Sequence, residues 1–205
     1  LKSIFFIEIC YFYSYIASIS FRVYLKFMSV KINYKSISSK QNSSNLVLFV
    51  DEKYNISDIK KYISSSEFSF LLDLLKNKDL KREILKFDLS SKKKIILVSL
   101  KKNISASGIE NLGASFYDQF KTNKINNFVL VSDTFSTKQK SLIGYFVHGL
   151  KLKSYIFEKY KTKKNKKNIS IIVTGKNKPS SKDQLKFNAI EEGTYYTRDL
   201  VSEPG

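Results

Sequence analysis

Short blocks of hydrophobic residues, separated by polar turns, run along the chain from Met28 onward. Mostly apolar runs are typical of strands that are buried in a sheet, and alternation with a period of two indicates a half-buried strand. The first pattern predicts strands over 45–50, 94–100, 128–131 and 169–173, and the second predicts strands over 29–35 and, more weakly, 84–89.

Apolar residues three and four positions apart predict helices between these strands. Ser66 is the expected cap of a helix to Leu75, Thr137 caps one to about Leu150, and another helix covers 105–120. A short strand is expected over 154–158. A long final helix opens near Pro179 and runs to about Val201, with a capping box formed by Ser181 and Gln184.

Strands that alternate with helices predict an α/β fold with a mixed or largely parallel sheet flanked by helices. A length of 205 residues suits one such domain and a little more. We therefore expect an α/β domain over 28–178, followed over 179–205 by a connecting helix and the start of a further domain. The lysine-rich stretch 161–168 is expected to be a solvated connection.

The first 27 residues differ from the rest because they are dense in aromatic residues and lack turn signals. Glu8 and Arg22 bound an apolar stretch that is shorter than the about 20 residues a membrane-spanning helix needs. A signal-like segment and a structural element remain open interpretations. We expect instead that translation begins at Met28, the only methionine, and that 1–27 is upstream sequence.

The charge of the chain raises the question of nucleic-acid binding, because 36 lysine and arginine residues against 18 acidic ones give a formal charge of +18. Such charge favours contact with phosphates, but only three of the basic residues are arginine, the side chain best suited to reading bases. Compositional bias explains the lysines more simply. Cys10 is the only cysteine and His148 the only histidine, so an internal disulfide and a structural zinc site within the chain are excluded.

Three further features have a functional and a structural interpretation. His148 is the only imidazole base, but it precedes Gly149, an expected helix C-cap, and no acidic partner is nearby in sequence. Gly108 and Gly113 match no phosphate-binding fingerprint and favour close helix–sheet packing. The aromatic residues of a lysine-rich segment mimic a nucleic-acid stacking platform, although packing of a core strand explains them too: Tyr155, Phe157 and Tyr160, among Lys153, Lys159 and Lys161.

Two segments carry a resemblance to a known family. The first is Arg198-Asp199-Leu200-Val201, followed by Glu203-Pro204, with Ser202 where Asn is usual. The second is Gly149 followed by Tyr155, Phe157, Tyr160 and Lys161, and a weaker third match covers 108–120. Along the chain these segments fall in the order and roughly the spacing of the cytosol (leucyl) aminopeptidase family, and they resemble its N-terminal domain and the linker into its catalytic domain. The resemblance covers about 28–205.

This resemblance implies a macro-domain-like N-terminal lobe of a peptidase that releases N-terminal amino acids from peptides. The family uses two divalent metal ions, Mn or Zn, in a catalytic domain whose Asn-Thr-Asp-Ala-Glu-Gly-Arg motif has no counterpart here. We therefore expect no catalytic, cofactor-binding or metal-binding residues among these 205 residues. The resemblance further implies a homo-hexamer of the full-length enzyme and a cytoplasmic location.

Further expectations complete this interpretation. The chain ending at Gly205 indicates an incomplete reading frame, and the portion given should be inactive by itself. A weak nucleic-acid contact and no stable membrane insertion are expected. The alternative function is a stand-alone macro-like or lysine-rich domain that binds nucleotide or nucleic acid.

Overall fold

The computed structural model describes residues 30–35, 45–76, 80, 82–90, 93–122, 126–135, 142–162 and 168–204. The expectations for residues 1–27 and for Thr137 lie outside these described residues. So does most of the lysine-rich connection, from 163 to 167.

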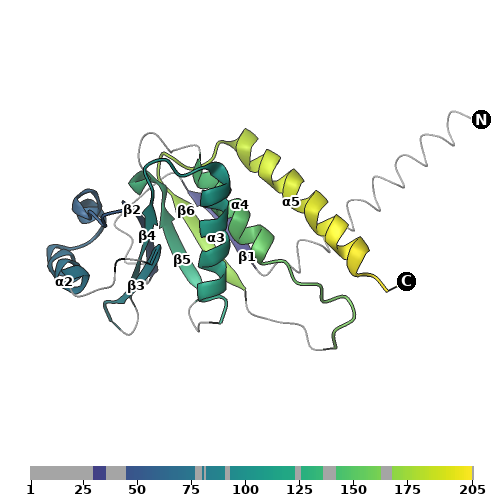
Figure 1. Cartoon of the computed structure of the whole chain (residues 1–205), viewed down its shortest axis with the longest axis horizontal. Helices are drawn as coiled ribbons and strands as arrows, with labels where there is room; N and C mark the ends of the chain where they lie inside the picture. Colours follow the sequence, from purple (N-terminus) through teal and green to yellow (C-terminus); the bar gives the residue numbers. More distant parts are fainter. Residues whose placement is uncertain are drawn as a thin grey trace, which may run out of the picture.

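A six-stranded mixed sheet forms the centre of the fold (Figure 1). Its order is β1-β6-β5-β2-β4-β3, and every neighbouring pair is parallel except β3 with β4. This confirms the predicted α/β class. The strands are β1 (Val30–Lys35), β2 (Asn45–Asp51), β3 (Ile84–Asp88), β4 (Lys94–Leu100), β5 (Asn127–Val131) and β6 (Ile169–Thr174).

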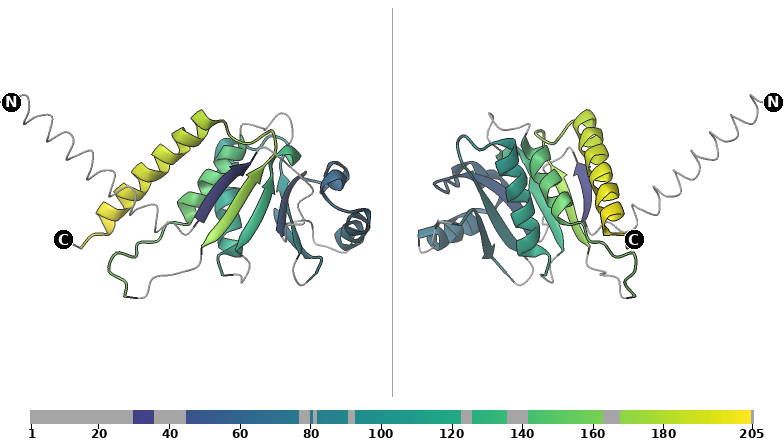
Figure 2. Two further views of the ribbon diagram at one scale, coloured as in Figure 1. Left: turned by 180° about the vertical axis from the view of Figure 1, so that it is seen from behind. Right: turned by 45° about the vertical axis from the view of Figure 1, so that its right-hand side comes forward.

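Helices cover both faces of this sheet. Alternate side chains of the central strands point to opposite faces, so Val47 and Phe49 join one core and Leu46 and Leu48 join the other. The first core lies under α3 (Ala106–Phe120) and α4 (Ile143–Lys153), and the second under η1 (Ser57–Tyr62) and α2 (Ser65–Lys76). The short η2 (Ser132–Thr134) follows β5, and α5 (Ser181–Ser202) lies outside α4 (Figure 2).

Two glycines allow α3 and α4 to approach closely. A Cβ atom at Gly113 would lie 1.9 Å from the backbone oxygen of Phe146, and one at Gly149 would lie 1.9 Å from that of Glu110. The close packing expected at Gly113 is therefore between two helices, and the predicted helix–sheet packing was wrong. Gly149 is inside α4, which continues to Lys153, so it is not a C-cap either.

Two predicted helix caps are wrong by one or two residues. The Ser64 hydroxyl, not that of Ser66, accepts from the amide of Glu67, whose carboxylate accepts from the Ser64 amide in return. At the start of α5, Ser180 rather than Ser181 accepts from the amide of Asp183. A run of serines offers several equivalent caps, and only the backbone conformation selects one.

Residues 154–158 do not form the predicted strand. Ser154 ends α4, and 155–158 run irregularly alongside α5. The Tyr155 side chain is half-buried against α5, and the alternating pattern does not distinguish such a position from one in a sheet.

Among the helices that the structure describes, none combines the length and hydrophobicity that crossing a membrane requires.

Candidate functional site

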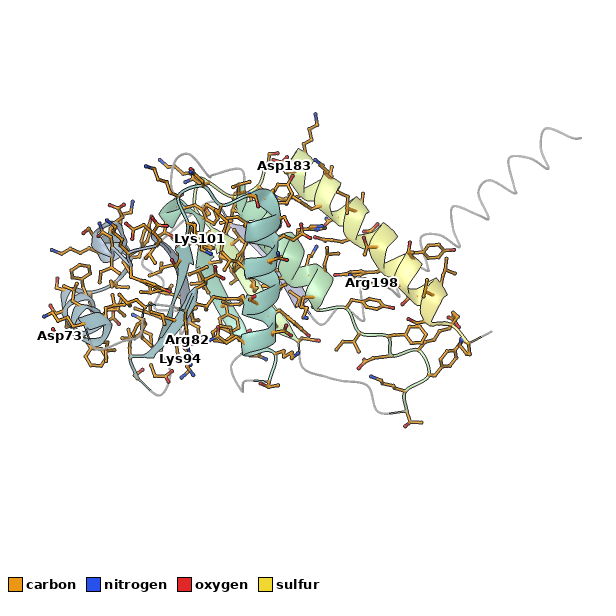
Figure 3. All side chains as sticks on the ribbon, in the orientation of Figure 1. Asp73, Arg82, Lys94, Lys101, Asp183 and Arg198 are labelled. Atoms are coloured by element: carbon orange, nitrogen blue, oxygen red, sulfur yellow. The ribbon has the colours of Figure 1, made fainter. Side chains whose placement is uncertain are left out.

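The two segments that carry the family resemblance meet where α4 packs against α5. We call this contact the α4–α5 seam: α4 residues 143–153, the following segment 154–160, and α5. Arg198 lies between α5 and the end of α4 (Figure 3), and its Nη1 donates to the Leu152 carbonyl at 2.7 Å. The Tyr155 hydroxyl donates to Asp199 Oδ1 at 2.6 Å. Sequence segments more than 40 residues apart thus form one structural unit.

The polar contacts of the seam satisfy the C-terminal end of α4. The last carbonyls of a helix have no partner within it. The Tyr195 hydroxyl donates to the Lys151 carbonyl at 2.5 Å, and the Arg198 guanidinium donates to the Leu152 carbonyl. Tyr155 stacks on Tyr195 with ring centroids 5.5 Å apart, and the Arg198 guanidinium lies 5.4 Å from the Tyr155 ring. These contacts hold α5 in a defined direction along α4.

A buried charged cluster lies deeper in the seam. Glu191 is 2% exposed, and its two oxygens contact His148 Nδ1 at 2.9 Å and Lys151 Nζ at 2.5 Å. Lys151 also donates to Asn188 Oδ1 at 2.9 Å, and the His148 ring lies 5.1 Å from that of Phe187. The acidic partner that sequence reasoning did not find for His148 is therefore Glu191, 43 residues later.

This cluster uses the imidazole as a contact between helices. The His148 ring packs against Phe187, and its Nδ1 contacts the Glu191 carboxylate, which Lys151 also binds. Such a group fixes the position of α5, since a buried carboxylate needs both cationic and hydrogen-bonding partners. No nearby sequence signal could have identified Glu191, because Glu192 beside it has the same chemistry and is exposed.

Burial shifts the titration of two seam tyrosines, Tyr195 and Tyr155, and of Tyr34 on β1. The pKa of Tyr34 and that of Tyr195 are raised by burial and then by the charge of Glu191. Burial, followed by the hydrogen bond to Asp199, raises the pKa of Tyr155 to about 12. An unfolded tyrosine loses its proton near pH 10, so the folded form holds these protons more tightly.

Alkaline conditions should therefore weaken the fold. For a raised folded pKa, the stability is complete below the unfolded pKa of about 10 and is lost as the pH rises towards the folded value. We expect the urea midpoint to fall between about pH 10 and pH 12. Tyr155→Phe should reduce this fall, whereas Tyr196→Phe, at an exposed position, should leave it unchanged. Equal pH dependence in both variants would contradict the assignment.

The aromatic segment after α4 packs on α5 rather than within a strand. Phe157 and Tyr160 form an edge contact with centroids 5.8 Å apart. The side chains of Lys159 and Tyr160 both donate to Glu203, and these hydrogen bonds lower the pKa of that carboxyl group. Tyr155, the inner member of the suggested stacking platform, already has Tyr195 and Arg198 on its ring.

The carboxyl ends of parallel strands are the usual ligand-binding edge of such sheets. Here Asp133 Oδ1 accepts from the amides of Lys176 and Asn177 at 2.7 and 3.3 Å, and the Thr134 hydroxyl accepts from the Phe49 amide at 2.9 Å. At the start of α3 the Ser105 hydroxyl accepts from the Gly108 amide at 3.1 Å. These donors, which a phosphate would need, are engaged within the protein. The described residues also contain no group of three or more His, Cys, Asp or Glu side chains placed to hold a metal ion.

Comparison with solved structures identifies what this fold is similar to. The fold is that of an α/β domain with a mostly parallel mixed sheet and a long C-terminal helix. A mutant of the leucine aminopeptidase from tomato matches over 85% of this chain, with a TM-score of 0.62 and 16% identity. The bottromycin maturation enzyme BotP, in complex with Mn, matches over 79% with a TM-score of 0.54 and 12% identity.

These similarities concern the fold and only part of each enzyme. The matched region spans 38% of the tomato chain and 32% of BotP. No protein-family model and no curated protein sequence matches this chain. The comparisons therefore support a structural resemblance to one portion of metallo-aminopeptidases, which agrees with the resemblance seen in the sequence.

Proposed function

We propose that this chain is the N-terminal, non-catalytic portion of a leucyl aminopeptidase. The observation that carries the proposal is the α4–α5 seam: the two segments that resemble the family in sequence are the ones that contact each other, through Arg198 and Tyr155. A chance resemblance of two short motifs gives no reason for them to meet. The similarity in fold to two metallo-aminopeptidases supports the proposal independently of these motifs.

In this proposal the domain positions the rest of the enzyme. The seam gives α5 a fixed direction, so the chain that follows it would start from a defined place and orientation. The two divalent metal ions, Mn or Zn, and the binding of peptides would belong to that following domain. Assembly into a homo-hexamer, a cytoplasmic location and a weak nucleic-acid contact are further parts of the proposal.

The proposal is tested with an antibody raised against the 205-residue chain. The native protein is immunopurified, and its mass and its hydrolysis of leucine amide with Mn²⁺ are measured. We expect a polypeptide considerably longer than 205 residues whose turnover a chelator abolishes. The 205-residue chain alone, under the same conditions, should give no turnover above buffer.

Two outcomes would contradict this function. The first is a native polypeptide of 205 residues or fewer without peptidase activity. The second is metal-dependent turnover by the 205-residue chain itself. Saturable binding of a nucleotide or an oligonucleotide by such a short native protein would favour the stand-alone module instead.

A further inference from the structure

Three side chains of the α4–α5 seam bring an amine, an amide and a carboxylate together. Lys151 Nζ donates to Asn188 Oδ1 at 2.9 Å and to Glu191 Oε2 at 2.5 Å. Asn188 and Glu191 are three residues apart on α5, so the helix presents both side chains to the same point on α4. Figures 1 and 2 show α5 running alongside α4, in agreement with these contacts. The fold thus holds a nucleophile, an acylating group and an acid–base group in one place.

Lys151 Nζ lies close to the carbon atom that it would attack. Because the C=O bond is about 1.2 Å long, the contact of 2.9 Å with Oδ1 places Asn188 Cγ within about 4 Å of Nζ. Groups held at about 3–3.5 Å in a suitable direction react far faster than the same groups free in solution. The flexible four-carbon stem of lysine allows the small rotation that closes the remaining gap.

The low exposure of this contact gives the Lys151 proton a place to go. The Glu191 side chain is 2% exposed and that of Lys151 is 12% exposed, so little water reaches them. Transfer of one proton from Nζ to Oε2 turns the ion pair into a neutral amine and a neutral acid, and it removes two charges from a buried position. The neutral form need be reached only transiently, since a desolvated neutral lysine amine is a nucleophile.

We propose that Lys151 and Asn188 form an isopeptide bond in the folded chain, with Glu191 as the acid–base group. The lone pair of Nζ forms the bond to Asn188 Cγ, and the electron pair of the bond between Cγ and Nδ2 goes to Nδ2. Glu191 takes one proton from Nζ before the attack and gives it to Nδ2, which leaves as ammonia. It then takes a second proton from Nζ, so the products are a secondary amide, ammonia and a protonated Glu191. The step needs no oxidant and no co-reactant.

The different exposures of the three side chains suit this direction of reaction. Asn188 is exposed, so the ammonia that it loses can pass into solvent and be diluted. The bond would join positions 37 residues apart and tie α5 to α4 covalently. Such a cross-link restricts the unfolded chain, and it would keep α5 in its direction when the seam is strained. This modification does not depend on the aminopeptidase assignment.

The intact mass of the folded 205-residue chain tests the bond. We expect the mass to fall by that of one ammonia molecule during incubation, and a branched tryptic peptide to join the segments of Lys151 and Asn188. The chain kept unfolded in urea should retain its full mass, because the two side chains are then no longer held together. Lys153→Arg is the matched control, since it changes another lysine of α4 and should lose ammonia as the original chain does.

Three variants assign the role of each group. Asn188→Ala changes an exposed position, so it should fold and should keep its full mass. Lys151→Arg preserves the positive charge, but a guanidinium does not give up its proton, and this variant should keep its full mass too. Glu191→Gln removes the acid–base group at similar size and should slow the loss of ammonia by roughly a hundredfold or more.

Several results would overturn the proposal. One is a folded original chain that keeps its full mass. Another is loss of ammonia that persists in Lys151→Arg or Asn188→Ala, since an asparagine elsewhere can also lose ammonia by closing a ring with its own backbone. Loss of water in place of ammonia would put the bond at Glu191. If Glu191→Gln does not fold, the other two variants still decide, and an unchanged rate in a folded Glu191→Gln would refute its acid–base role.

Discussion

Replacing Gly113 with alanine is expected to lower the free energy of unfolding by about 3 kcal/mol or more. The added methyl group would lie 1.9 Å from the Phe146 oxygen and 3.0 Å from the Leu150 nitrogen. Both are backbone atoms of α4, so no side-chain rotation can relieve the overlap. The two helices must separate, which disturbs the aromatic core where Phe116 and Phe146 have centroids 5.7 Å apart.

Urea unfolding of the purified chain measures this effect. Gly193→Ala is the matched control: it is also inside a helix, but nothing lies within 4 Å of its Cβ. That variant should be more stable than the original by about 0.5–1 kcal/mol, because alanine has the higher helix propensity. Similar free energies for the two variants would mean that α3 and α4 are not in this close contact.

Removal of the Glu191 carboxylate should be about as damaging. Glu191→Ala is expected to cost about 3–5 kcal/mol, since it leaves the buried cation of Lys151 without its anionic partner. Both contacts that Glu191 makes join α5 to α4. The loss should therefore appear at α5 first, as faster proteolysis and faster amide exchange there than in the sheet.

Glu192→Ala controls for the loss of an acidic residue from the same turn of α5. Glu192 is exposed, so its replacement should change the free energy of unfolding by no more than about 0.5 kcal/mol. The triple variant His148→Leu, Lys151→Met, Glu191→Leu adds a further comparison. Because it removes the whole buried cluster, it should recover much of the stability that Glu191→Ala loses. A mild effect of Glu191→Ala would show that α5 is held mainly by its tyrosines and Arg198.

The strands were the most predictable part of this protein. Runs such as 46–50 and 95–98 are apolar because both faces of a central strand are covered. Such a strand can therefore be recognised from consecutive hydrophobic residues alone. The helix predicted over 105–120 was equally clear, and the structure has it over 106–120 with Ser105 as its cap. Segment 154–158 was not, because the spacing of Tyr155 and Phe157 is that of a strand although Tyr155 packs on α5.

The candidate site was predictable only in part. The segments around Tyr155 and Arg198 could each be recognised by their resemblance to the family, but their sequences do not predict that the Tyr155 hydroxyl donates to Asp199. The partner of His148 was hidden for a related reason. Glu191 and Glu192 are chemically identical neighbours, and the rotation of α5 about its axis decides which of them is buried.

The sequence by itself determined the α/β class, the positions of the strands and the long final helix, because burial and helix periodicity act on neighbouring residues. Only the tertiary structure decided which residues share the seam, which glycines bring α3 and α4 together, and which side of α5 stays exposed. These features depend on the relative placement of elements that are tens of residues apart. That placement is set by the packing of whole surfaces, which no local pattern contains.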